Sequence, residues 1–127
     1  MSAVKKEKYT EREYLEIERQ AETKSEFYEG EFFAMAGASR EHNIICSNIN
    51  YLLIRQVRKR RCEVYMSDMR VYIRKYGLYT YPDISLVCGE AEFIDGVFDT
   101  LLNPSVLVEV LSKTTEDYDK NQKFDFY

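Results

Sequence analysis

The segment 105–111, Ser-Val-Leu-Val-Glu-Val-Leu, constrains the fold more than any other part of the chain. Its aliphatic and β-branched residues are typical of a central strand that is covered on both faces. Glu109 interrupts this run, and an unpaired buried carboxylate is costly, so Glu109 must be protonated, paired with a cation or bound to a metal. The alternative is an edge strand from which Glu109 faces solvent. Acids in such surroundings gather at functional sites.

Periodicity predicts two helices and a strand pair in the first half of the chain. Thr10 and Glu13 have the spacing of a capping box, which starts a helix that runs to about residue 22. Residues 26–35 predict a strand pair or a bent strand. Ser39 is a candidate N-cap for the longest helix, residues 40–60, which is predicted from apolar residues that recur at helical spacing: Ile45, Ile49, Leu52, Leu53 and Val57.

The second half changes to a strand pattern. Residues 62–74 and 79–88 each predict one strand, joined by a turn at 75–77, and a polar connection with a turn at 95–96 leads to the central strand. A last helix starts at 114–117. This order predicts an α/β or α+β fold with a mixed β-sheet flanked by helices. We expect residues 1–127 to be one domain, truncated or shortened at the C-terminus, because the last helix is still periodic at residue 127.

Composition excludes several classes of protein. No apolar stretch reaches the ~20 residues of a membrane span, and residues 1–8 lack the apolar core of a signal peptide, so we expect a cytoplasmic protein without a membrane partner. The odd count of three cysteines, with no Cys-x-x-Cys pair and one histidine, argues against a structural zinc site. Reduced, packed thiols are the expectation for Cys46, Cys62 and Cys88.

Charge is unevenly distributed although the net charge is −4. Residues 55–75 contain eight Lys and Arg against two acids, whereas residues 83–127 contain ten acids and three Lys. The basic segment suggests a surface that contacts nucleic-acid phosphates, and the acidic region suggests a neighbouring pocket that binds cations. The candidate phosphate contacts are Arg55, Arg58, Lys59, Arg70 and Arg74. Alternatively, Arg58–Arg61 closes the long helix, where positive charge complements the helix dipole.

Asp83 is a second candidate acid, because it follows Pro82 at the head of the predicted strand 79–88. If this strand neighbours 105–111, Asp83 and Glu109 share one divalent cation, Mg²⁺ or Mn²⁺, with water and substrate phosphate completing the coordination. Such a pair suits phosphodiester hydrolysis, in which the metal activates water and stabilises the charge on the phosphate. A hydrolase with a Ser or Cys nucleophile has little support, since no Gly-x-Ser-x-Gly turn is present.

Several short motifs occur in the order found in a known family. They are Glu26-Phe-Tyr-Glu-Gly30-Glu, His42-Asn-x-Ile45, Pro82-Asp83, Glu109-Val-Leu-Ser112 and Asp119-Lys120-x-x-Lys123. Together they resemble the Uma-two family of restriction-endonuclease-like proteins, within the PD-(D/E)XK nuclease superfamily. The resemblance covers roughly residues 10–127 and implies a mixed sheet of four or five strands and Mg²⁺-dependent cleavage of DNA.

The resemblance also implies roles for individual residues. Asp83 and Glu109 match the metal-binding acids. The lysine that usually lies two positions after the glutamate is Leu111 here, so the implied substitute is Lys123 from the following helix, with Lys113 as second choice. His42 matches a helical histidine that contacts metal-bound water or phosphate.

Glu26 matches another family acid, which bounds the pocket. Tyr118 and Tyr127 stack on bases or pack in the core. A homodimer is expected by analogy with related nucleases. The competing hypothesis is a catalytically inactive binding or assembly module, favoured by the net acidity and the missing strand lysine.

Overall fold

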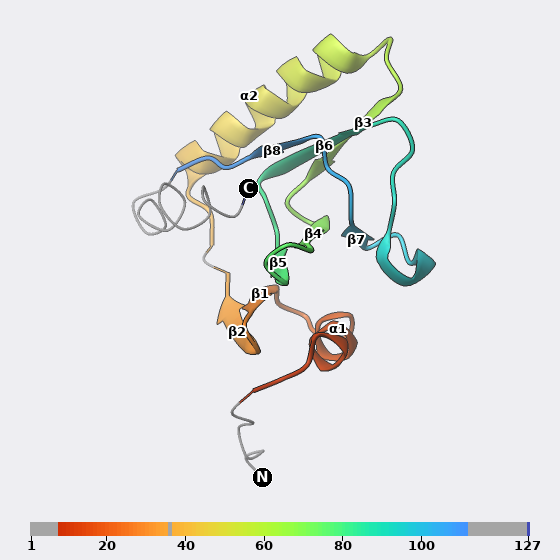
Figure 1. Cartoon of the computed structure of the whole chain (residues 1–127). Coiled ribbons are helices and arrows are strands. Elements are labelled where there is room, and N and C mark those ends of the chain that lie inside the picture. Colours follow the sequence, from red (N-terminus) through yellow and green to blue (C-terminus); the bar gives the residue numbers. More distant parts are fainter. Residues whose placement is uncertain (1–7, 36, 112–126) are drawn as a thin grey trace.

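The computed structural model describes residues 8–35, 37–111 and 127. These residues contain two α-helices and eight strands (Figure 1). The strands form two sheets, with the orders β2-β1-β5-β4-β7 and β3-β6-β8. The elements are α1 (Glu11–Glu18), β1 (Ser25–Tyr28), β2 (Glu31–Ala34), α2 (Arg40–Val57), β3 (Cys62–Met66), β4 (Arg70–Ile73), β5 (Leu78–Thr80), β6 (Ile84–Cys88), a 3-10 turn (Ile94–Gly96), β7 (Thr100–Leu101) and β8 (Val106–Val108). The predicted mixture of helices and β-sheet is confirmed, with two sheets in place of one. None of the described helices is both long and apolar enough to cross a membrane.

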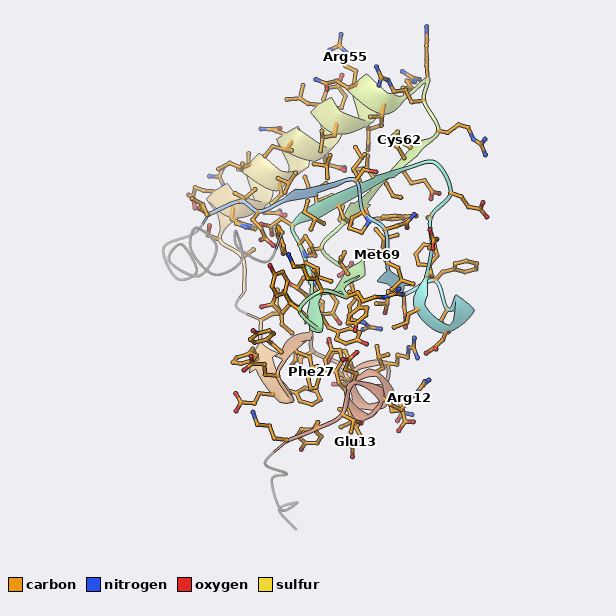
Figure 2. The ribbon with its side chains drawn as sticks, viewed as in Figure 1. Arg12, Glu13, Phe27, Arg55, Cys62 and Met69 are labelled. Atoms are coloured by element: carbon orange, nitrogen blue, oxygen red, sulfur yellow. A yellow bond between two sulfur atoms is a disulfide. The ribbon has the colours of Figure 1, made fainter. Side chains whose placement is uncertain are left out.

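Helix α1 begins with the predicted capping box. The Glu13 amide donates to Thr10 Oγ1 at 3.1 Å, and the Thr10 amide donates to Glu13 Oε1 at 2.9 Å. Tyr14 is fully buried and stacks on Phe27 of β1, with ring centroids 4.7 Å apart. Figure 2 shows Phe27 between the β1–β2 hairpin and α1. The helix ends before the predicted residue 22, because residues 19–24 are polar apart from one alanine and have nothing to pack into this core.

The strand pair predicted at residues 26–35 is confirmed as the β1–β2 hairpin. Its two strands are antiparallel, with Phe27 opposite Phe32. Glu29 and Gly30 connect them with φ angles of 49° and 82°, and this left-handed conformation matches the twist of a two-residue hairpin. The hairpin joins the five-stranded sheet through pairing of β1 with β5. It therefore places Glu26 inside the protein, where this side chain is 6% exposed.

Helix α2 begins at the predicted cap, where the His42 amide donates to Ser39 Oγ at 3.1 Å. The helix lies across the three-stranded sheet (Figure 1). Cys46 is buried on the packed face, whereas Ile45 and Leu52 are 46% and 52% exposed. The predicted helix is confirmed over Arg40–Val57, but some of the apolar residues at helical spacing remain exposed. The three-stranded sheet is narrow, so it covers only part of the apolar surface of α2.

The segment 62–88 forms an antiparallel ribbon that passes from one sheet to the other. Its predicted strands each break in two: β3 pairs with β6 in the three-stranded sheet, and β4 pairs with β5 in the five-stranded sheet. Pro82 lies in one break, where it cannot donate to a ladder. The prediction of two uninterrupted strands is therefore wrong, and the break positions Asp83 immediately before β6.

Two further differences concern the C-terminal strands. The connection expected to be irregular contains β7, which pairs in parallel with β4 and makes the five-stranded sheet mixed. β8 is three residues long and, among the described residues, pairs with β6 alone. In the part of the chain that the structure describes, β8 therefore lies at the edge of its sheet, as in the edge-strand alternative and unlike the central strand predicted at 105–111, and Glu109 follows its last residue.

Cys62 and Cys88 form a disulfide, so the expectation of reduced thiols is wrong for these two. They are directly opposite each other in the β3–β6 ladder, with Cα atoms 4.0 Å apart. Sequence spacing does not reveal this proximity, which arises from the strand register. Cys46 is free and buried, as expected.

Candidate active site

Asp83 and Glu109 meet at one end of the three-stranded sheet. β6 and β8 are antiparallel with Ile84 opposite Val108, so the start of β6 lies beside the end of β8. Continuing that register brings Asp83 next to Glu109. The amide of Val110 donates to Asp83 Oδ2 at 2.6 Å, which ties the two segments together. The prediction that these two segments are neighbours is confirmed.

His42 joins this pair from the first turn of α2. Its Nε2 lies 3.2 Å from Asp83 Oδ2, and both side chains are 15% exposed. Cys46 follows one helical turn later on the same face, with Sγ at 3.7 Å from His42 Nδ1. One ligand atom from each of His42, Cys46 and Asp83 lies within 4.8 Å of the other two. Three donor atoms of different chemistry therefore converge beside Glu109.

Cys46 is unsuited to act as a nucleophile. Burial raises the pKa of its thiol to about 11, and the negative charges of Asp83 and Glu109 act in the same direction. The thiol is therefore protonated near neutral pH, whereas reactive cysteines have a lowered pKa and some exposure.

Glu26 and Glu109 are linked through Tyr127. The Tyr127 hydroxyl donates to Glu109 Oε1 at 2.6 Å. Thr80 of β5 donates a hydrogen bond to the buried Glu26. Burial and the charge of Glu109 raise the pKa of Tyr127, Glu26 adds to this rise, and a hydrogen bond with Thr80 opposes it. Four residues of the candidate site expected from the sequence (Glu26, His42, Asp83 and Glu109) therefore lie in one region.

The position of the usual superfamily lysine is occupied by Leu111, which is 43% exposed. The two lysines considered as substitutes, Lys113 and Lys123, lie outside the described residues, as do Tyr118 and the predicted last helix. Tyr127 was expected to stack on a base or to pack. Instead, its hydroxyl donates a hydrogen bond to Glu109, a candidate metal ligand.

Arg70 does not belong to a DNA-binding surface. It is 4% exposed, donates to Thr100 Oγ1 and the Tyr81 hydroxyl at 2.9 Å each, and pairs with Asp99 at 3.0 Å. The prediction of a phosphate contact at Arg70 is therefore wrong, since its guanidinium is committed inside the protein. Tyr81 in turn donates to the buried Glu18 at 2.6 Å, so this network joins α1 to the five-stranded sheet.

The other basic candidates are exposed on two different elements. Arg55, Arg58 and Lys59 lie at the C-terminal end of α2, and Figure 2 shows Arg55 pointing away from the sheets. Arg74 lies in the turn between β4 and β5. These side chains remain available for phosphate contacts, although they do not form a single stripe along one element.

Sequence reasoning missed Cys46 and Thr80 as parts of the site. Thr80 carried no signal, because its contact with Glu26 depends on the pairing of β1 with β5. Cys46 did carry a sequence signal. It follows His42 by four residues in the predicted long helix, and residues at this spacing lie on the same helix face.

A family model described as "Putative restriction endonuclease", Uma2, matches residues 11–127. The chain belongs to the Uma2 family. The resemblance noted in the sequence is thereby confirmed.

Individual proteins agree with this assignment. The chain is 44% identical to "Uncharacterized protein sll1609" of Synechocystis sp. over 115 residues, which are 91% of this chain and 65% of that protein. It is 35% identical over 115 residues to "Uncharacterized protein slr1290" of the same organism, covering 91% of this chain and 60% of that protein. The chain thus spans less than two thirds of the length of these relatives.

A solved structure supports the fold. A crystal structure from Anabaena variabilis, described as "a putative nuclease", superposes with a TM-score of 0.70 at 19% sequence identity. The match covers 88% of this chain and 63% of that chain. At this identity the likeness confirms the α+β fold predicted for the Uma2 family, and the chemistry must be argued from the site of this chain.

Proposed function

We propose that this Uma2 chain is a metal-dependent endonuclease that hydrolyses phosphodiester bonds in DNA. The observation that carries the proposal is the meeting of Asp83 and Glu109, which are far apart in sequence, where β6 begins and β8 ends. The family is described as a putative restriction endonuclease and the Anabaena protein as a putative nuclease, which is the same class of activity.

The donor set fits a hard divalent cation. Asp83 and Glu109 offer carboxylate oxygens from adjacent segments, and one or two carboxylates with water and substrate oxygens are the usual ligands of Mg²⁺ and Mn²⁺. The Val110 amide holds Asp83 in place through Oδ2. When bound, such an ion lowers the pKa of coordinated water and offsets the charge that grows on the phosphate.

The remaining candidate residues have positioning and binding roles in this proposal. His42 orients Asp83 through their 3.2 Å contact, and Glu26, whose charge acts on Tyr127, bounds the site. Lys123 orients the attacking water in place of the lysine missing at Leu111. The phosphates of the DNA backbone are contacted by exposed basic residues, namely Arg55, Arg58, Lys59 and Arg74.

A catalytically inactive binding module is the second candidate. Two observations favour it: Leu111 replaces the usual lysine, and Tyr127 donates to Glu109 Oε1, an oxygen that a metal would otherwise use. Under this proposal the chain retains the nuclease fold and binds a partner without cleaving it.

Mn²⁺ titration and plasmid cleavage distinguish the two candidates. Calorimetric binding of Mn²⁺ is measured for the wild type, Asp83→Asn, Glu109→Gln and the matched control Asp68→Asn, whose side chain is 97% exposed. Nicking of supercoiled plasmid is measured with the same proteins. The endonuclease proposal expects the first two variants to lose binding and nicking together, and the control to keep both. Binding without nicking supports the inactive module, and a wild type that binds no Mn²⁺ refutes the metal-dependent enzyme.

A further inference from the structure

We propose that His42, Cys46 and Asp83 form a binding site for a transition-metal ion of the Zn²⁺ or Co²⁺ class, which shares Asp83 with the carboxylate site of Asp83 and Glu109 but adds nitrogen and sulfur ligands. Imidazole nitrogen, thiolate sulfur and carboxylate oxygen are all ligands that Zn²⁺ takes in proteins. Nitrogen and sulfur donors are a poor match for Mg²⁺, which prefers oxygen.

The spacing of the donor atoms suits tetrahedral coordination. Metal–ligand bonds of about 2.1 Å to nitrogen or oxygen and ~2.3 Å to sulfur place tetrahedral ligands ~3.4 to 3.6 Å apart. The distance from His42 Nε2 to Asp83 Oδ2 is 3.2 Å, and the distance from Nε2 to Cys46 Sγ is 4.0 Å. All three ligand atoms lie within 4.8 Å of one another. The proposed coordination requires the Cys46 side chain to rotate so that Sγ moves closer to the other two ligand atoms.

Elements of regular structure hold the three ligands. His42 and Cys46 lie one turn apart in α2, whose first turn is fixed by the Ser39 cap, and Asp83 is held by the Val110 amide. Hydrogen bonds of this kind to a ligating carboxylate are typical of the shell around metal ligands. With three protein ligands, the fourth position is left for water or substrate, as in catalytic zinc sites. On binding, the thiol proton of Cys46 passes to solvent.

The inference goes beyond the proposed function, because it requires neither DNA nor cleavage. Asp83 serves both sites: Oδ2 faces His42, which leaves the second carboxylate oxygen for an ion shared with Glu109. A simpler account has a His42–Asp83 hydrogen bond with Cys46 packed beside it as a protonated thiol. The two accounts differ in whether sulfur binds the metal.

Cobalt absorption tests for sulfur ligation directly. Co²⁺ is titrated into the full chain with its disulfide formed, so that Cys46 is the free thiol. We expect a near-ultraviolet band from charge transfer between thiolate and Co²⁺, together with intense visible bands typical of four-coordination. Cys46→Ser should abolish the charge-transfer band, whereas Cys62→Ser/Cys88→Ser, the matched control, should keep it.

The single histidine provides a second measurement. Because His42 is the sole histidine, the protein gives one set of imidazole proton resonances, and Zn²⁺ should shift this set at one equivalent. His42→Ala should weaken Zn²⁺ affinity by more than the ~10- to 100-fold typical of losing an outer partner. Retained binding by Cys46→Ser that lacks only the charge-transfer band still identifies sulfur as a ligand.

Co²⁺ binding without a charge-transfer band in the wild type would overturn the inference, and so would Zn²⁺ binding that leaves the imidazole resonances unmoved. The first result would exclude Cys46 as a ligand, and the second would exclude His42. Failure to bind Co²⁺ and Zn²⁺ would also overturn it. Plasmid nicking with Mg²⁺ or Mn²⁺ decides the endonuclease proposal separately, so failure of one proposal is distinguishable from failure of the other.

Discussion

Reduction of the Cys62–Cys88 disulfide is expected to destabilise the protein substantially. The two cysteines are 26 residues apart in sequence, and the bond closes the whole ribbon from β3 to β6. For a loop of this length, the chain-entropy model predicts a loss of about 3.5 kcal/mol in the free energy of unfolding. Domains of this size are stable by ~5 to 15 kcal/mol, so the loss is a large fraction of the total.

Urea denaturation followed by circular dichroism, with and without reductant, measures this effect. Cys88 is exposed, so reductant reaches the bond in the folded protein. The double variant Cys62→Ser/Cys88→Ser should show the same loss and should no longer respond to reductant, which separates the disulfide from any effect on Cys46. A loss below ~1 kcal/mol in both experiments would refute the loop-closure reasoning. It would mean that residual pairing of β3 with β6 already restricts the unfolded chain without the disulfide.

Three further predictions concern the buried network and the catalytic proposal. Arg70→Met should lower the free energy of unfolding by ~2 kcal/mol, since it removes the buried hydrogen bonds to Thr100 and Tyr81 while Asp99 keeps its pairing with Arg19, and it should leave the salt dependence of DNA binding unchanged. Burial favours a neutral Asp99, but hydrogen bonds from Arg19 and Thr100 outweigh it and lower its pKa. The stability from Asp99 is therefore present above the unfolded pKa of ~3.9 and lost as pH falls through the folded pKa; urea denaturation across acidic pH should show a shallower loss in Asp99→Asn. Lys123→Ala should reduce the plasmid nicking rate by ~100-fold or more while Mn²⁺ affinity measured by calorimetry is unchanged.

Local patterns predicted the elements whose signals lie within a few residues. The Thr10 capping box, the Ser39 cap and the hairpin at Glu29 and Gly30 all formed where expected, because each depends on neighbouring backbone groups and turn chemistry. Asp83 and Glu109 could also be singled out, since a carboxylate next to a strand of aliphatic residues is conspicuous at the level of sequence.

Features that depend on strand register could not be predicted in this way. Arg70 looked like a surface cation in a basic segment, but the parallel pairing of β4 with β7 places it beside Thr100, next to Asp99. The disulfide likewise depends on Cys62 facing Cys88 across the ladder. A shift of one residue in register moves every side chain to the opposite face, and nothing in a local window specifies that shift.

The sequence by itself determined the Uma2 family and the mixture of helices and strands, and it singled out Asp83 and Glu109 as candidate acids. The tertiary structure alone decided which donors join them. His42 and Cys46 reach Asp83 because α2 crosses the three-stranded sheet, and Thr80 reaches Glu26 because β5 pairs with β1. Local propensity acts over a few residues, whereas a binding site requires side chains from distant segments to converge, and only the packing of the sheets against the helices brings these segments together.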